Sequence, residues 1–203
     1  MILTLDRLVP AWAAALHAAD HRRPVWTSRS GRVHQAGIGP HAEDAAMALM
    51  LTELRSEPAF SGVAMGQSLP YPGDGRQKCD LFFGDPLEWV VEAKMARFRG
   101  DNGKPDDTSL KDLLSPYPAD RSALTDAVKL ARPAFGCRKA VLIYGFEYVD
   151  RPLEPAIHAF ERLASELVEL GAPVQAPLED LVHPVHATGA VFGWEVASRV
   201  VTR

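Results

Sequence analysis

The feature that most constrains the fold is a pair of short apolar runs separated by turn-forming residues. The runs cover residues 81–83 and 87–91, and a Gly-Asp-Pro sequence at 84–86 lies between them. Aromatic and β-branched residues on both sides of such a break are typical of a β-hairpin. We therefore expect two adjacent antiparallel strands, and a turn centred on the proline would pair Phe83 with Trp89.

Alternation along these strands predicts a charged face. Glu92 and Lys94 point to the same side of the second strand, because alternate residues of a strand share a face. The expected pairing places Asp80 of the first strand opposite Glu92. Side chains directly opposite each other lie ~5 Å apart, and like charges placed in this way are destabilising. Two carboxylates and an ammonium on a half-buried surface therefore predict a bound cation.

These residues resemble the core motif of a known superfamily. Asp80, followed after eleven residues by Glu92-Ala93-Lys94, is similar to the motif of the PD-(D/E)XK nucleases, which have the restriction-endonuclease-like fold. That family carries its Asp on one strand and its Glu-x-Lys on the next. Cys79 stands where the name-giving proline would be, a position that the family varies freely. The resemblance covers roughly residues 37–147.

The resemblance implies a metal-dependent nuclease. Asp80 and Glu92 would hold Mg²⁺ or Mn²⁺, because Mg²⁺ in proteins is typically held by one or two carboxylates. A bound ion lowers the pKa of water and neutralises charge that develops on a phosphate. Lys94 would orient that water or offset the negative charge of the transition state. The alternative interpretation is an exposed sheet face with an ordinary Glu–Lys pair.

The rest of the pattern predicts one α/β domain over residues 1–203. The expected core elements are a helix at 41–56, a strand at 62–71, the hairpin strands, a helix at 121–132 and a strand at 139–148. This αβββαβ order is that of the restriction-endonuclease-like core, a mixed central sheet flanked by helices. Residues 1–36 would form an N-terminal extension, and residues 148–203 a C-terminal helix and strand.

Two other segments have weaker patterns. Pro10 suits the first position of a helix, so we expect a short Ala-rich helix to begin there. Residues 96–119 lack a clear periodicity and contain a glycine-rich, charged stretch. A connection of this length within a compact domain indicates a functional lid or a disordered segment.

Glu43 is a further candidate ligand. It lies in the first turn of the expected 41–56 helix, on the same stripe as Met47 and Met50, so it points inward. A carboxylate directed toward a core normally has a partner or a metal. The alternative is a simple preference for negative charge at a helix N-terminus. The resemblance implies an acidic residue from this helix, so we expect Glu43 to reach the cation, with Glu53 as second choice.

Basic residues in two segments are candidate substrate contacts. The resemblance implies a contribution from the helix after the Glu-x-Lys strand, where Arg121, Asp126 or Lys129 would serve. A solvated helix face with an Asp–Lys pair three residues apart is the alternative. Arg97 and Arg99 flank an aromatic residue just beyond the motif, where the wall of a groove would lie.

Composition excludes several classes of protein. The net charge of −4 argues against indiscriminate coating of nucleic acid, although it allows a local basic groove. No signal-like N-terminus and no apolar run of membrane-spanning length occur, so we expect no membrane partner. The two cysteines, Cys79 and Cys137, lie beside strand-like segments and indicate a cytoplasmic protein with reduced thiols.

A pair of histidines near the C-terminus has the spacing of metal ligands. Pro184 lies between His183 and His186, and no third ligand is evident in the sequence. We therefore expect this pair to be structural.

The expected function is hydrolysis of a nucleic-acid phosphodiester, with DNA as the first choice of partner. A homodimer is the oligomeric state considered, because superfamily members that cut both strands often act as dimers. One alternative is a non-catalytic binding or assembly module that retains the nuclease fold. Another is hydrolysis of a phosphoester outside nucleic acid. Binding of Mg²⁺ or Mn²⁺ at Asp80 and Glu92 would distinguish the enzyme from the module.

Overall fold

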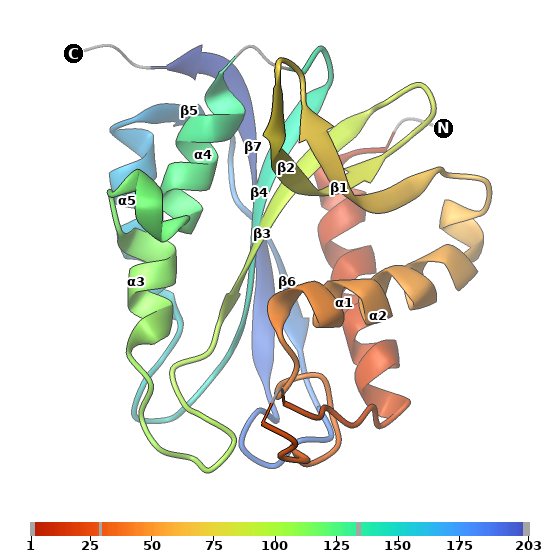
Figure 1. The fold of residues 1–203 in the computed structure, drawn as a ribbon, viewed down its shortest axis with the longest axis vertical. Helices are drawn as coiled ribbons and strands as arrows, with labels where there is room; N and C mark the ends of the chain where they lie inside the picture. The colour runs from red at the N-terminus through yellow and green to blue at the C-terminus, as the bar shows by residue number, and fades with distance from the viewer. Residues whose placement is uncertain (1–2, 29, 133–134, 201–203) are drawn as a thin grey trace.

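The computed structural model describes residues 3–28, 30–132 and 135–200, which form a β-sheet between two layers of helices (Figure 1). Helices α1 (Leu5–His21) and α2 (Glu43–Ser56) lie on one side of the sheet. Helices α3 (Thr108–Leu114), α4 (Ala123–Ala131) and α5 (Glu154–Ser165) lie on the other side. Turns of 3₁₀ helix cover Pro58–Phe60 and Pro118–Asp120. The expected α/β class is confirmed.

The sheet is mixed and mostly antiparallel. Its strands in the described residues are β1 (Met65–Tyr71), β2 (Asp74–Phe83), β3 (Trp89–Ala96), β4 (Arg138–Phe146), β5 (Val168–Leu170), β6 (Val174–Leu178) and β7 (Gly189–Val200). Their order is β1-β2-β3-β4-β7-β5, and β6 also pairs with β7. Only β3 and β4 run parallel among these pairs, and the connection between them carries α3 and α4.

The hairpin forms with the expected register. Phe83 pairs with Trp89 and Leu81 pairs with Val91, and the β2–β3 ladder ends there. β2 is longer than expected because it begins at Asp74, within the stretch predicted to be loop, and Asp74 pairs with Tyr71 of β1. The outer half of β2 therefore pairs with β1 alone. Together they form a two-stranded ribbon that extends beyond the end of the β2–β3 ladder (Figure 1).

The two ends of the chain complete the same core. β7 pairs with β4, so the C-terminal strand lies inside the sheet. The side chain of Trp12 on α1 is fully buried. A Cβ atom at Gly193 of β7 would lie 2.6 Å from Val9 of α1, so the glycine allows this helix to approach the sheet closely. The segments expected to be extensions of the 37–147 core thus contribute to the main hydrophobic cluster.

α1 begins earlier than expected. It starts at Leu5, so Pro10 lies inside the helix and the prediction of a start at Pro10 was wrong. A proline inside a helix removes one backbone hydrogen bond. Here Leu8 and Val9 before it and Trp12 after it are all buried, and their burial favours the continuous helix.

The segment after β3 packs against the domain. Phe98 and Leu113 are buried in the core, and an isolated bridge joins Arg99 to Pro105. Because Phe98 is only 4% exposed, it is not available to stack on a nucleic-acid base. None of the helices in the described parts of the chain is long and apolar enough to cross a membrane.

Candidate active site

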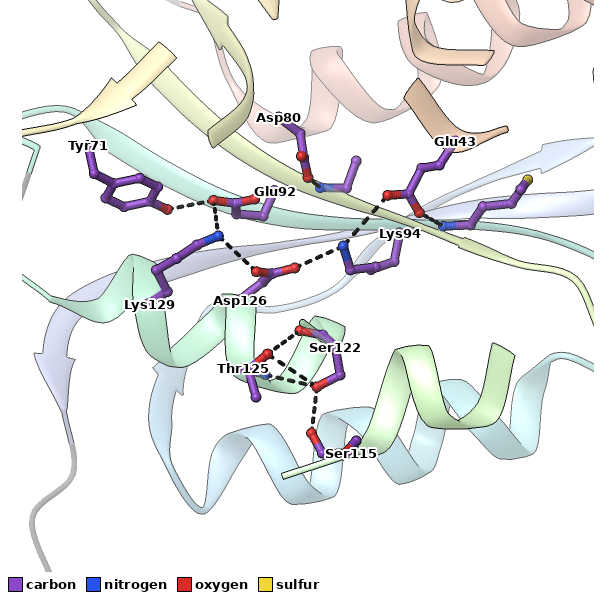
Figure 2. Close-up of polar contacts among 12 residues, drawn as sticks. Glu43, Tyr71, Asp80, Glu92, Lys94, Ser115, Ser122, Thr125, Asp126 and Lys129 are labelled. Atoms are coloured by element: carbon purple, nitrogen blue, oxygen red, sulfur yellow. Dashed lines mark hydrogen bonds and ion pairs between the residues drawn. The ribbon is translucent and has the colours of Figure 1, made fainter. Parts of the chain in front are cut away.

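The candidate site begins where β2 and β3 separate. Beyond the end of their ladder, the N–H of Ala93 donates to Asp80 Oδ2 at 2.8 Å, and the N–H of Met95 donates to Glu43 Oε2 at 2.6 Å (Figure 2). Alternate residues of a strand direct their N–H groups to the same edge. Two carboxylates therefore take the place of a partner strand along this edge of β3, and both come to lie beside the Lys94 side chain.

The side chains of Glu92 and Lys94 contact α4. Glu92 is 2% exposed, accepts a hydrogen bond from the Tyr71 hydroxyl at 2.6 Å and pairs with Lys129 Nζ at 2.8 Å. Lys94 Nζ lies 3.1 Å from Asp126 Oδ2 and 3.6 Å from Glu43 Oε1. Charges of opposite sign alternate through this network, which is called here the acidic cluster. Its members are Glu43, Asp80, Glu92, Lys94, Asp126 and Lys129 (Figure 2).

The position of α4 depends on its N-terminal cap. Ser122 Oγ accepts a hydrogen bond from the Thr125 N–H at 3.2 Å and donates to the Ser115 carbonyl at 2.5 Å. Serine caps of this kind typically stabilise a helix by ~1 kcal/mol. Asp126 and Lys129 are three residues apart, so they share the face of α4 that is turned toward β3. Their charged atoms lie 2.9 Å apart.

Burial changes the ionisation of the acids. It raises the pKa of Glu43 to about 7, against the opposing effects of Lys94 and the Met95 N–H. Burial also raises the pKa of Glu92 to about 8, with further contributions from Asp126 and Asp80. Both carboxyl groups therefore titrate near neutral pH.

The lysines remain charged. Burial lowers the pKa of Lys94, but the carboxylates of Glu43, Asp126 and Asp80 outweigh it and the net shift is upward. The pKa of Lys129 is likewise raised, because Glu92 and Asp126 outweigh its burial. When every member is ionised, four carboxylates face two ammonium groups, which leaves a charge of −2 in a confined space.

A cavity of about 320 Å³ adjoins the acidic cluster. Asp80, Glu92 and Asp126 form its acidic lining. Exposed basic residues also line it, and this basic rim consists of Arg76, Lys78, Arg121 and Arg132. A basic rim around an acidic floor suits a ligand that has negative charge outside and a cation at its centre.

The four residues expected to contact substrate differ in whether they line this cavity. Arg121 and Lys129 line this cavity, although Lys129 is also held by Glu92 and Asp126. Arg97 lines an adjoining hollow that shares Lys94 and Arg121, and it donates to the Gly39 carbonyl.

Arg99 does not line either cavity. It binds the Gly103 carbonyl and the Asp150 carboxylate in the loops. An isolated bridge also joins Arg99 to Pro105. A role for Arg99 in a groove wall stays a prediction.

Of the two candidate acids on α2, Glu43 is the one that meets β3. Glu53 lies near the other end of the helix and pairs with Arg22 at 3.1 Å. The sequence interpretation missed Tyr71, whose hydroxyl reaches Glu92. The β1–β2 register shifts between Pro70 and Tyr71, just where this tyrosine lies. No residue spacing in the sequence predicts that shift.

Comparisons with protein-family models, with curated proteins and with solved structures return no match to this chain. The residues of the acidic cluster are therefore the basis on which a function can be inferred.

Proposed function

We propose that this chain is a metal-dependent phosphodiesterase that acts on nucleic acid, with the acidic cluster as its active site. The observation that carries the proposal is a group of four carboxylates and two lysines, with Glu92 and Asp126 buried and the rest half-buried, beneath a basic rim. A divalent cation would neutralise the charge of −2 that the cluster carries when all four carboxylates are ionised. A phosphate backbone is the polyanion that a basic rim of this kind would attract.

The side chains fit a hard cation such as Mg²⁺ or Mn²⁺. Asp80 and Glu92 would be its ligands, with Glu43 binding directly or through one water. A carboxylate has about four lone-pair sites. Asp80 and Glu43 each use one oxygen for a backbone N–H, so both retain acceptor capacity for an ion. When bound, such an ion lowers the pKa of its water and offsets charge on the phosphate.

Lys94 would act as a fixed positive charge. Its raised pKa keeps it protonated, so it can donate to a water or to a phosphate oxygen, and it is unsuited to the role of a base. Contacts with Asp126 and Glu43 hold the ammonium in place before any substrate arrives. Such preorganisation is what makes a charge effective in a transition state.

The arrangement of elements supports the same proposal. α2, β1, β2, β3, α4 and β4 follow one another in the order expected for a restriction-endonuclease-like core, with α3 inserted before α4. Asp80 and the Glu-x-Lys sequence lie on neighbouring strands, as in the superfamily that the sequence resembles.

One observation favours a non-catalytic module as the second candidate. Lys129 already bridges Glu92 and Asp126, at 2.8 and 2.9 Å, and so neutralises part of the cluster without a metal. A module that binds nucleic acid through its basic rim would need nothing more. The two candidates differ in whether a divalent ion binds at Asp80 and in whether phosphodiester bonds are cut.

The test is cleavage of labelled DNA and RNA with Mg²⁺ or Mn²⁺, and with a chelator as control. The wild type and a Glu53→Gln control should cut only with metal, and Asp80→Asn should not cut. Metal-independent binding of the same oligonucleotides without cleavage, unchanged in Asp80→Asn, would favour the module. Cleavage that is equal in wild type and Asp80→Asn would show that the site lies elsewhere.

A further inference from the structure

The loop after β3 and the loop before β7 lie at the same end of the sheet, at the lower edge of Figure 1, and they carry a second cluster of metal-ligating side chains. His183 and His186 belong to the loop before β7, and Asp101 belongs to the loop after β3. One ligand atom from each residue lies within 4.8 Å of the others. The sequence offered no third ligand for the histidine pair, and the fold supplies one from a distant segment.

The spacing of Asp101 and His186 fits a shared ion. Asp101 Oδ1 lies 3.6 Å from His186 Nε2, which is too far for a hydrogen bond. Two ligands of one tetrahedral ion, each bonded at ~2.0–2.2 Å, lie roughly 3.3–3.6 Å apart. His186 is fully buried, and within the described residues its Nε2 has no hydrogen-bond partner.

Other side chains orient these two ligands. The Tyr148 hydroxyl lies 2.7 Å from His186 Nδ1. If Nδ1 carries the proton and donates it to the tyrosine oxygen, the lone pair of Nε2 is directed at Asp101. His34 Nδ1 contacts the other carboxylate oxygen of Asp101 and leaves Oδ1 for the ion. Contacts of this kind commonly fix the orientation of metal ligands.

His183 completes the set. Its ring stacks on that of His186 with centroids 4.6 Å apart, and its Nε2 is buried without a partner in the described parts of the chain. Val185 N–H donates to His183 Nδ1 at 3.2 Å. Coordination through Nε2 moves the ring proton to Nδ1 and gives up this long hydrogen bond, while it provides a partner for the buried Nε2.

The segment before α2 closes the cluster from solvent. A Cβ atom at Gly39 would lie 2.4 Å from His186 Cδ2, and one at Gly37 would lie 3.0 Å from His183 Cβ. Only glycine allows the backbone to come this close to both histidines. Both histidines are fully buried, and metals bind the neutral form of imidazole.

Charged neighbours have opposite effects on cation binding at this cluster. The buried Asp20 carboxylate accepts hydrogen bonds from the Ile38 and Val182 N–H groups at 2.6 and 2.5 Å, and it adds negative charge beside His183. Arg97 lies 3.9 Å from Asp101 Oδ1 and competes with a cation for that oxygen. An ion at this site would therefore weaken the Arg97–Asp101 contact.

We propose that Asp101, His183 and His186 bind a first-row divalent transition ion of the Zn²⁺ class, which ties the loop after β3 to the loop before β7. Imidazole nitrogens suit Zn²⁺, whereas Mg²⁺ prefers oxygen ligands, so this site differs in selectivity from the acidic cluster. The inference is independent of the proposed nuclease activity.

The test is calorimetric titration of the chelator-treated full chain with Zn²⁺ in excess Mg²⁺. Wild type should bind one Zn²⁺, and Asp101→Asn and His186→Gln should each weaken binding at least about tenfold. His158→Gln, on the exposed face of α5, and Asp80→Asn, in the acidic cluster, should match wild type. Equal affinity in all five proteins, or a loss confined to Asp80→Asn, would overturn the proposal.

A measurement on the wild type keeps the test decisive if a variant fails to fold. In ¹⁵N spectra of the histidine rings, Zn²⁺ should shift the resonances of two buried histidines and leave that of the exposed His158 in place. Absence of a Zn²⁺-dependent shift in any buried ring would refute the site by itself.

Discussion

The affinity of the acidic cluster for Mg²⁺ should fall steeply between about pH 8.5 and about pH 6. Ligand carboxylates must be deprotonated, so protons compete with the ion. With pKa values of about 8 for Glu92 and about 7 for Glu43, this competition at about pH 6 weakens binding roughly 100-fold and 10-fold, respectively. At about pH 8.5 the combined effect is below about twofold. The expected change is therefore about 10³-fold, or ~4 kcal/mol.

Calorimetry of the metal-free protein in two buffers of different ionisation enthalpy measures both affinity and proton release. About two protons should leave per Mg²⁺ at about pH 6, and fewer than about half a proton at about pH 8.5. In Glu43→Gln, the roughly 10-fold weakening of Mg²⁺ binding that protonation of Glu43 causes should disappear, and the roughly 100-fold weakening caused by Glu92 should remain. Glu53→Gln, which changes the acid paired with Arg22, is the matched control on the same helix.

The same groups predict how the stability of the metal-free protein depends on pH. A carboxyl group whose pKa is raised by folding favours the folded state when protonated. Stability should therefore fall as the pH rises from 4.5, the ordinary value, through about 8, and Mg²⁺ should restore it at the alkaline end. Mg²⁺ binding at about pH 6 without proton release, or an affinity that does not change with pH, would refute the placement of the ion between these carboxylates.

Three further predictions concern single side chains. Asp80→Asn should abolish the rise in melting temperature that Mg²⁺ gives to wild type, and an equal rise in both proteins would contradict the site. Lys94→Ala should lose cleavage without losing Mg²⁺ affinity in calorimetry, because the ammonium is not a ligand and its removal, like that of Lys129, takes away a positive charge that opposes the ion; parallel loss of cleavage and affinity would contradict this assignment of roles. Lys129→Met should bind Mg²⁺ more tightly than wild type at about pH 8.5, since losing one positive charge favours a divalent ion more than a competing proton, and weaker binding would assign Lys129 a supporting role.

Local patterns in the sequence were sufficient to predict the register of the hairpin and the approach of Glu43 to β3. The register of the hairpin follows from a turn at residues 84–86 and from a two-residue alternation, both of which depend on neighbouring residues alone. The inward direction of Glu43 follows from its place on an apolar stripe of α2. Each of these inferences needs only a few residues of context, and the structure places the side chains accordingly.

Features that depend on distant segments could not be predicted in this way. The contact between Tyr71 and Glu92 requires a local register shift in the β1–β2 ribbon. The approach of Asp101 to His183 and His186 requires three loops to meet at one end of the sheet. The place of β7 inside the sheet is equally non-local, because its alternation alone does not identify β4 as its neighbour.

The charge of the acidic cluster is the feature that argues for a function beyond structure. Asp80 and Glu43 have a structural role, since each satisfies a backbone N–H that β2 has left without a strand partner. Glu92 and Asp126 instead pair with the lysines, and buried ion pairs of this kind contribute little to stability. A purely structural solution would balance the charges or replace them with apolar side chains. Retention of two excess carboxylates, with the pKa of Glu92 raised to about 8, is the feature that supports our proposal of a divalent cation at this cluster.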